Sequence, residues 1–307
     1  MILRRMPALG HAAFRRWFYQ RWGHENCVIA ARTRRAEYPL FQQRLSVKAA
    51  WGGTESYFLD GRRVAVDDEH YLILNDARSY ASALHGREPV TSFAIFFRPG
   101  MAADVTRCHA LPADTLLADP EGHGTVEFSE HLRPHDPLVT PVLRFIYRQI
   151  ELGVTDEAWL EDQSYFLVGR MLAVHRNDLA AARLLPVRRA STRRELFRRI
   201  GLAVNFIHTG YAQPIGLTEI AAAAQLSPYH CLRLFKALHG VTPVEYLNRR
   251  RVRLAERLLR NTGGTVDEVA ARVGFACRAT LYRQCRRLCG SAPSALRRSA
   301  ANSPLSR

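Results

Sequence analysis

The sequence TVDEVAARVGFACRATLYRQCRRLCGSAP, residues 265–293, predicts a short helix, a tight turn and a second helix. About fifty residues earlier, LTEIAAAAQLSPYHCLRLFKALHGVTP, residues 217–243, has nearly the same pattern. Small residues in the first helix of each copy allow the two helices to pack closely, and the turn sets the second helix at a steep angle. In helix-turn-helix proteins that second helix enters the major groove of DNA. The duplication therefore favours DNA recognition over a purely structural helical repeat.

The two copies align residue for residue with one insertion. Leu226 corresponds to Phe275 at an offset of 49, whereas Gly240 corresponds to Gly290 at an offset of 50. One extra residue therefore enters the second copy at its turn or at the start of its second helix. The pattern predicts second helices over residues 228–238 and 278–288, and a long helix over residues 244–261 between the copies. The spacing of the apolar residues assigns the core positions Leu226, Leu234, Phe235, Phe275 and Leu281.

The charge of the chain is concentrated at one end. Residues 1–186 contain 22 basic and 22 acidic side chains, whereas residues 187–307 contain 22 basic and six acidic ones. The formal net charge of +16 therefore lies entirely in the C-terminal part. Such segregation indicates a polyanion partner for that part, with a merely solvated basic surface as the alternative. The sequence contains no run of apolar residues long enough for a membrane span.

The N-terminal half reads as strands. In ESYFLDGRRVAV, residues 55–66, apolar residues alternate on both sides of Asp60-Gly61, which is a strong hairpin signal. Further strands are expected over residues 70–75 and 92–97. Several short strands with turns between them predict a small antiparallel barrel or sandwich.

The pattern becomes helical after Pro141. Residues 142–152 and 157–185 have apolar positions at helical spacing and predict two helices. The polar, basic stretch VRRASTRR predicts a linker that ends at a helix start, with Ser191 or Thr192 as the N-cap and Glu195 in the first turn.

The first 24 residues are basic and partly apolar. Arg15 and Arg16 interrupt the apolar run, so a secretory signal is not expected. The segment reads as a frayed arm, or as a stretch ahead of the true start. The six cysteines form no CxxC pair, which predicts free thiols in a reducing cytoplasm.

Residues 193–299 resemble the DNA-binding domain of the AraC/XylS family of bacterial transcription regulators. The resemblance rests on LTEIAAAAQLSPYHCLRLFKALHGVTPVEYLNRRRVRLAERLL, on TVDEVAARVGF and on the Gly-x-x-Pro that ends the second unit. It implies that one monomer places two recognition helices in successive major grooves, about 34 Å apart. A single chain would then read an asymmetric DNA site, and a homodimer would read two such sites.

The resemblance also implies which side chains contact DNA, because motif positions can be carried over. Arginine forks onto guanine in the major groove, whereas arginines outside the groove bind phosphate and fix register. The implied base contacts are Tyr229, Leu232, Arg233, Arg278, Ala279, Thr280 and Arg283. The implied phosphate contacts are Arg249, Arg250, Arg251, Arg286 and Arg287.

The strand-rich region is similar to the cupin-like jelly-roll domain that precedes this DNA-binding domain in many family members. The similarity rests on residues 55–66, 67–76, 78–82 and 92–97. Cupin enzymes bind a metal with a His-x-His pair, and this chain contains no such pair. We therefore expect no metal, no cofactor and no enzymatic activity, but a small organic effector inside the barrel. The candidate effector-binding residues are Trp51, Tyr57, Tyr71, Arg78, Tyr80 and His85, with ordinary packing as the alternative for each.

Together these readings predict an α+β protein of two domains. An N-terminal antiparallel jelly-roll barrel with helices precedes an all-α domain with two helix-turn-helix motifs joined by a long helix. The expected segments are an arm over 1–24, a cupin-like regulatory domain over 25–135, a helical dimerisation or connector segment over 136–186, a linker over 187–192, the DNA-binding domain over 193–299 and a disordered tail over 300–307.

The resemblance suggests a dimer contact in the connector helices, and RNA polymerase is a further candidate partner beside double-stranded DNA. The seam residues would be Leu160, Leu167, Met171 and Val174, unless these side chains pack on the barrel instead.

The second copy departs from the family at two cysteines. Cys285 stands where family members carry phenylalanine, matching Phe235 of the first copy, and Cys289 replaces an aromatic residue before the glycine. Three readings are open for this pair: buried small hydrophobes, a redox-sensitive pair, or part of a metal site with Cys277 and His230. Two alternative functions follow, namely a regulator gated by thiol oxidation and an enzyme fusion like the alkylation-repair regulators.

Overall fold

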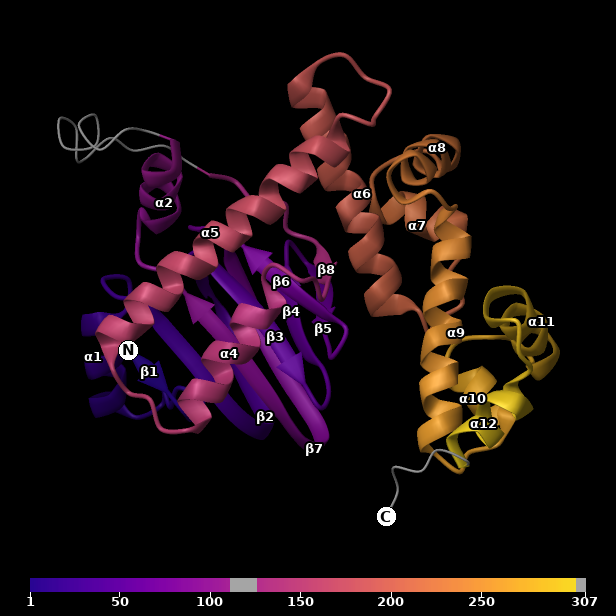
Figure 1. The fold of residues 1–307 in the computed structure, drawn as a ribbon, viewed down its shortest axis with the longest axis horizontal. Helices are drawn as coiled ribbons and strands as arrows, with labels where there is room; N and C mark the ends of the chain where they lie inside the picture. Colours follow the sequence, from indigo (N-terminus) through magenta and orange to yellow (C-terminus); the bar gives the residue numbers. More distant parts are fainter. Residues whose placement is uncertain (111–125, 302–307) are drawn as a thin grey trace. The chain divides into compact units, whose positions relative to one another are not determined.

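The computed structural model describes residues 1–110 and 126–301. It divides into two compact units, Met1–Arg183 and Leu184–Arg307, and each is described by itself. Figure 1 shows the helices and strands of both units in chain order. Of the tail expected over residues 300–307, residues 302–307 lie outside the described residues.

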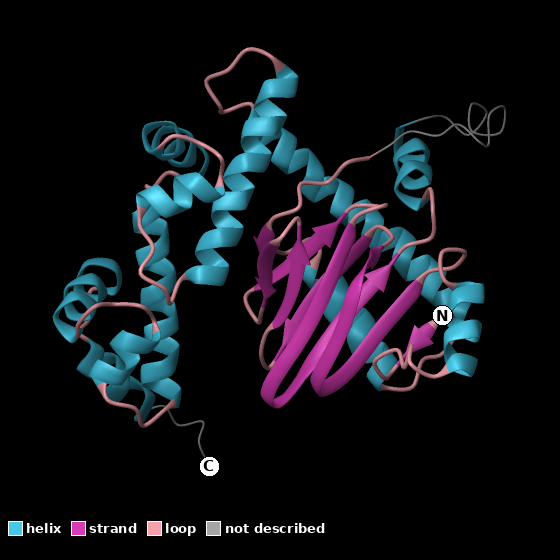
Figure 2. Cartoon of the chain, turned by 180° about the vertical axis from the view of Figure 1, so that it is seen from behind, coloured by secondary structure: helices cyan, strands magenta, loops and turns pink. Residues whose placement is uncertain are grey.

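The first unit is built on a sheet whose strands pair antiparallel except for β1 and β2, as the alternating patterns largely predicted (Figure 2). Its central strand β7 pairs with β2 along one edge, and with both β3 and β4 along the other edge. The strand order is β1-β2-β7-β3-β6-β8, and β5 pairs with β4. Among the described residues this path has two ends, so a jelly-roll arrangement stays a prediction. The strands are β1 (Ile2–Leu3), β2 (Cys27–Gln42), β3 (Ser46–Trp51), β4 (Glu55–Leu59), β5 (Arg62–Val66), β6 (His70–Leu74), β7 (Ser79–Phe96) and β8 (Leu132–Pro134).

The β4–β5 hairpin confirms the signal in its turn. Tyr57 pairs with Val64 and Leu59 with Arg62. Asp60 and Gly61 connect the strands with φ values of 50° and 72°. Both residues therefore adopt the left-handed conformation that a tight two-residue hairpin turn requires.

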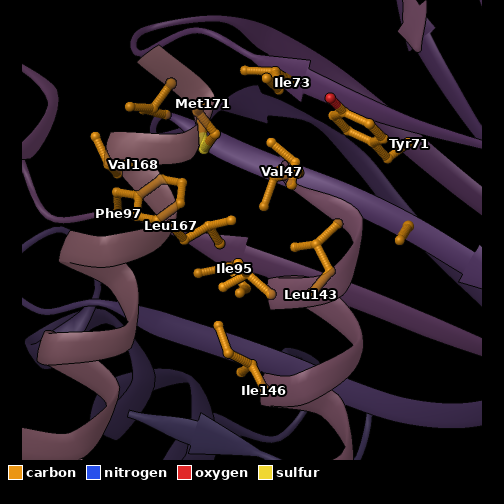
Figure 3. Close-up of a cluster of buried hydrophobic side chains, with 14 of the residues drawn as sticks. Val47, Tyr71, Ile73, Ile95, Phe97, Leu143, Ile146, Leu167, Val168 and Met171 are labelled. Carbon is orange, nitrogen blue, oxygen red and sulfur yellow. The ribbon is translucent and has the colours of Figure 1, made fainter. Parts of the chain in front are cut away.

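Helices α4 (Thr140–Glu151) and α5 (Glu157–Ala182) cover one face of the sheet, and α2 (Met101–Ala110) packs against α5. Figure 3 shows the resulting core. Alternate residues of the strands point toward the helices, because side chains of a strand alternate between the two faces of a sheet. The core includes Val47, Tyr71, Ile73, Ile95 and Phe97 from the sheet side and Leu143, Ile146, Leu167, Val168 and Met171 from the helices.

The helix residues assigned to a dimer seam belong to this core. They are Leu160, Leu167, Met171 and Val174, and all four are buried in the cluster that joins α4 and α5 to the sheet. The alternative reading, packing on the sheet of the same chain, is therefore the one that the structure shows. Their apolar spacing on α5 reflects this intramolecular contact.

The first 24 residues differ from the expected frayed arm. Met1 is buried, and β1 pairs in parallel with the start of β2. Helix α1 (Ala12–Arg21) places Phe18 in the same cluster as Phe96 of β7. The ring of Trp22 stacks on Phe18 at 5.0 Å between centroids and meets Phe96 at 4.6 Å. Aromatic residues four apart on one helix face thus anchor this segment to the sheet.

The second unit is entirely helical among its described residues. Its helices are α6 (Ala190–Gly210), α7 (Leu217–Ala223), α8 (Pro228–His239), α9 (Pro243–Asn261), α10 (Val266–Arg272), α11 (Arg278–Cys289) and α12 (Pro293–Ala301). One core lies around α6, α7 and α8, and a second lies around α9, α10 and α11. The predicted core residues Leu234, Phe235, Phe275 and Leu281 are buried, and Leu226 is half-buried.

The start of α6 corrects the predicted N-cap. The helix begins at Ala190 and Arg189 is its N-cap, without a side-chain capping bond, so neither Ser191 nor Thr192 caps it. Arg193 instead donates from Nη1 to the carbonyl oxygens of Val187 and Arg188 at 3.0 and 2.7 Å. Arg193 thus binds the backbone just before the helix, a contact that the residue preferences at helix N-caps do not predict.

Candidate nucleic-acid interface and interior cavity

Local capping signals set the bounds of α8. The Ser227 hydroxyl accepts a hydrogen bond from the backbone N–H of His230, and Pro228 occupies the first turn. The helix ends at Gly240, whose φ of 71° is left-handed. These are the residue types preferred at the two ends of a helix. The observed helix matches the range predicted for the first recognition helix.

The face of α8 opposite the core is available to a partner. Cys231, Leu234 and Phe235 are buried, which fixes the rotation of the helix. Tyr229 is consequently 76% exposed, Arg233 is exposed and Leu232 is half-buried. All three predicted base-contact residues of the first helix-turn-helix copy therefore lie away from the core face.

Helix α11 is placed by a turn that only glycine fits. Gly274 has a φ of 87°, and a Cβ there would lie 2.6 Å from the carbonyl oxygen of Tyr211. The close approach packs the turn of the second helix-turn-helix copy against the end of α6. On α11, the burial of Leu281 and Cys285 turns the opposite face outward. Its predicted base-contact residues are accordingly exposed at Arg278, Ala279 and Arg283 and half-buried at Thr280.

The structure corrects two of the five predicted phosphate contacts. Arg250 and Arg251 are only 4% and 8% exposed. Arg251 donates from Nε to the carbonyl oxygen of Tyr211 at 2.8 Å and from Nη2 to that of Gln213 at 2.7 Å. The Arg250 guanidinium lies 5.2 Å from the ring centroid of Tyr211. Both arginines therefore hold α9 to the end of α6 and are not presented to phosphate.

The remaining three arginines are exposed. Arg249 forms an ion pair with Glu245 at 2.8 Å along the same helix, an arrangement that water screens and that phosphate could replace. Arg286 and Arg287 lie in the last turn of α11, where Arg287 reaches Gln284 at 3.2 Å. Their positions are compatible with phosphate contacts.

The cysteines of the second copy occupy different environments. Cys285 is fully buried, and burial raises the pKa of its thiol to about 12. Cys289 is exposed, and partial burial raises the pKa of its thiol. Cys277 is the N-cap of α11, where a hydrogen bond from Thr280 lowers the pKa of its thiol. The buried small-hydrophobe reading therefore holds for Cys285 and is wrong for Cys289.

Four of the six predicted effector-binding residues pack against other side chains or face solvent. Trp51 packs against Phe93 and Tyr147 in the helix-covered core, with ring centroids 5.4 and 5.1 Å away. Tyr71 is buried in that core and donates a hydrogen bond to Asp136. Arg78 forms ion pairs with Asp60 and Glu130, and His85 is exposed on β7 beside Glu37. These side chains have structural partners or face solvent.

Tyr57 and Tyr80 do line a cavity, which lies on the face of the sheet opposite α4 and α5. The cavity volume is about 50 Å³. The sheet contributes Lys48, Glu55, Tyr57, Tyr80 and Phe96, and the N-terminal segment contributes Met6, Pro7, Leu9, Phe18 and Trp22. Sequence reasoning missed Lys48 and Glu55, because charged residues are almost always exposed. The available signal was the position of Lys48 in SVKAAW, residues 46–51, where every neighbour is small or apolar.

Among the described residues, no group of three or more His, Cys, Asp or Glu side chains is arranged to hold a metal ion. The metal reading of Cys277, Cys285, Cys289 and His230 therefore has no geometric support in residues 1–110 and 126–301. In the same ranges, no helix is long and apolar enough to cross a membrane.

Comparisons with known proteins concern the second unit. A family model described as a helix-turn-helix domain matches residues 220–299. YdeC, an HTH-type transcriptional regulator of Bacillus subtilis, is 38% identical over 77 residues, 25% of this chain and 26% of YdeC. AdaA of the same species, a bifunctional transcriptional activator and DNA repair enzyme, is 32% identical over 77 residues, 25% of this chain and 36% of AdaA. The DNA-binding domain of AdpA, solved with a target DNA, is 32% identical, and the match covers 35% of this chain and 97% of that one with a TM-score of 0.34.

The family model and the sequence relatives define the class of the C-terminal unit. Residues 220–299 form a helix-turn-helix domain of the AraC type. The chain spans about a quarter to a third of the length of these curated relatives. The match with AdaA lies in the helix-turn-helix part alone, so it says nothing of a repair activity in this chain.

Proposed function

We propose that this chain is a sequence-specific, DNA-binding transcriptional regulator that places α8 and α11 in successive major grooves. The observation that carries the proposal is the equivalent exposure of both helices. Each buries one face in its own core and presents an arginine at the same position of the repeat, Arg233 on α8 and Arg283 on α11. Arginine at such positions reads guanine by a bidentate hydrogen bond.

The charge of the second unit supports this reading. Arg249, Arg286 and Arg287 are exposed around the two helices and are suited to phosphate. The buried Arg250 and Arg251 have a separate role, because they tie α9 to α6 and so help to hold the two halves of the domain together. The arginines of this domain therefore have two roles: the exposed ones are suited to bind DNA, and the buried ones hold its helices together.

The test begins with selection of bound duplexes from a random DNA pool. Arg233→Ala and Arg283→Ala should each cost about 1–3 kcal/mol on the selected site and relax the preference at one base position. The matched control is Arg286→Ala, which should weaken binding to all sequences and lower the salt dependence by about one released ion. Equal affinity of the wild type for selected and scrambled duplexes would overturn the proposal.

We further propose that a small molecule in the cavity of the first unit controls DNA binding. In support, the cavity is lined by both aromatic and charged side chains, as ligand sites commonly are. The required effect is a difference in ligand affinity between the active and inactive states, since a ligand that binds both equally shifts nothing. A DNA affinity that stays constant when the cavity is occupied would contradict this part of the proposal.

We also propose that the chain forms a dimer through the solvent-exposed face of α4 and α5, because the predicted seam residues are buried against the sheet. Phe145 on α4 and Phe166 on α5 are 46% and 49% exposed. The ring centroids of Phe145 and Trp159 are 6.3 Å apart. Trp159 stands seven residues before Phe166 and therefore lies on the same side of α5. Large apolar side chains gathered outside a covered core favour a protein contact. The measurement is the molar mass in solution, and a monomer at all concentrations would argue against a dimer.

A further inference from the structure

The interior cavity contains two buried charged side chains that are not paired with each other. Lys48 is 1% exposed and Glu55 is 4% exposed. Within the described part of the chain, no ion pair within 4.0 Å joins them. The Lys48 ammonium nitrogen lies 3.3 Å from the ring centroid of Phe96, and 5.4 and 5.9 Å from those of Tyr80 and Tyr57. Aromatic faces therefore surround this amine.

Hydrogen-bonding capacity is left over around the amine. A lysine ammonium has three donors, and aromatic faces satisfy them only in part. The Glu55 carboxyl interacts with Ser92 and Tyr57, yet among the described residues its Oε2 atom and Gln43 Oε1 are buried without a hydrogen-bond partner. Lys48, Glu55 and Gln43 all line the same cavity. Buried polar groups are normally hydrogen-bonded, so a cluster of incompletely bonded ones indicates a bound polar molecule.

The choice of lysine at this position is informative. Only two of the 44 basic residues of the chain are lysines, Lys48 and Lys236. Arginine stays charged in proteins, whereas a buried lysine can release its proton and regain it when an anion arrives. Burial lowers the pKa of Lys48 and raises that of Glu55. The cavity can therefore keep a neutral total charge both empty and occupied.

We infer that the cavity binds a small organic acid, whose carboxylate accepts hydrogen bonds from Lys48 and whose apolar body lies against Tyr57, Tyr80 and Phe96. The inference rests on the proposed function, in which this cavity is the effector site, and adds the chemical class of the ligand. The volume of about 50 Å³ limits the acid to a few non-hydrogen atoms, since one water needs roughly 10–15 Å³. A hydroxyl on the acid would find an acceptor in Gln43 Oε1.

Binding of the acid is coupled to a proton. A ligand carboxylate and an ionised Glu55 would repel each other in a medium of low dielectric, so the occupied cavity contains charged Lys48 and protonated Glu55. The other titratable groups around Lys48 and Glu55 stay neutral, because burial raises the pKa of Tyr57 on β4, of Tyr80 on β7, and of Tyr38 and the Cys27 thiol on β2. One proton is therefore taken up per acid bound, whether the empty cavity holds an ion pair or two neutral groups.

The test uses the full chain with ¹³C-labelled lysine, which gives two side-chain signals. Propionate and lactate are titrated against propionamide and lactamide, the neutral counterparts of the same shape. The expected result is a saturable shift of the Lys48 signal with the acids, no shift of Lys236, and at least tenfold weaker binding of the amides. Calorimetry in buffers of different ionisation enthalpy should show uptake of about one proton. Equal binding of acids and amides, or no shift of Lys48 with either acid, would overturn the inference.

Two variants test the sign of the charge. Lys48→Met keeps the apolar length of the side chain and should abolish acid binding, whereas Lys236→Met is the matched control and should leave it unchanged. Glu55→Gln removes a negative charge at constant size, so acids should bind at least as tightly as to the wild type. Weaker acid binding by Glu55→Gln would contradict the protonated form of Glu55. The acid–amide comparison in the wild type does not depend on whether Lys48→Met folds.

DNA measurements separate this inference from the proposed function. If acids shift Lys48 while the affinity for the selected duplex stays constant, the ligand class stands and effector control fails. If neither acid shifts Lys48 while the chain still discriminates selected from scrambled duplexes, the ligand class fails and the DNA-binding regulator stands.

Discussion

Replacement of Arg251 by methionine should destabilise the helical unit rather than act on DNA directly. The substitution removes two charge-assisted hydrogen bonds, from Nε to Tyr211 and from Nη2 to Gln213. Each such bond contributes about 1.5–3 kcal/mol. Gln213 is exposed, so its carbonyl can accept from water instead, while methionine retains the packing of the aliphatic stem. We therefore expect a loss of about 2–3 kcal/mol in the free energy of unfolding.

The two units can be followed separately in the intact chain. All four tryptophans lie in the first unit, at Trp17, Trp22, Trp51 and Trp159, so tryptophan fluorescence reports that unit alone. Far-ultraviolet circular dichroism is dominated by helices and follows the second unit as well. With an m-value of about 2 kcal/mol/M, Arg251→Met should lower the urea midpoint of the dichroism transition by about 1 M. The fluorescence transition should not move.

The neighbouring Arg249 provides the matched control. It is exposed and paired with Glu245 along the helix, so Arg249→Met should change stability by less than about 0.5 kcal/mol. If Arg249 contacts phosphate, that variant should instead lower DNA affinity and its salt dependence. A stable Arg251→Met protein with the DNA defect of a lost phosphate contact would refute the structural role of Arg251.

Three further predictions follow from the same geometry. Gly274→Ala should lower the dichroism midpoint even more than Arg251→Met, because its Cβ would lie 2.6 Å from a backbone carbonyl oxygen at a φ of 87°; an unchanged midpoint would contradict this packing. Iodoacetamide at neutral pH should alkylate Cys277 faster than Cys285, because a hydrogen bond lowers the pKa of the Cys277 thiol and burial raises that of the Cys285 thiol to about 12. Bound DNA should slow the alkylation of Cys277, and mass spectrometry of the peptides measures both rates. Phe145→Arg with Phe166→Arg should convert a dimer to a monomer in light scattering without moving the fluorescence midpoint, and a dimer that persists would place the contact elsewhere.

Local signals explain why the helix-turn-helix elements could be predicted closely. A serine before a proline begins α8 and a left-handed glycine ends it, and both signals lie within the segment that they define. The apolar residues of α8 and α11 fix which face is buried, so the exposed arginines follow from spacing alone.

The roles of Arg250 and Arg251 could not be predicted in this way. They stand on the face of α9 that also carries the buried Leu247, Leu254 and Ala255, although charged side chains are rarely buried. Their partners lie at the end of α6, about forty residues earlier in the chain. Lys48 escaped prediction for a related reason, since the N-terminal segment and the distant strand β7 together enclose it.

Cys285 can replace the phenylalanine of the first copy because different side chains surround this position in the second copy. In the first copy Phe235 contacts His239 and Tyr246, with ring centroids 4.4 and 5.4 Å away. A cysteine at this position would leave a cavity, at a cost of about 3–5 kcal/mol if nothing refilled it. In the second copy, however, Cys285 shares its cluster with Leu296 of α12, and Leu288 packs against that cluster. Leu296 corresponds to Tyr246 of the first copy at the offset of 50, so the two cores differ at both positions of this contact and the motif does not require the same residue in each.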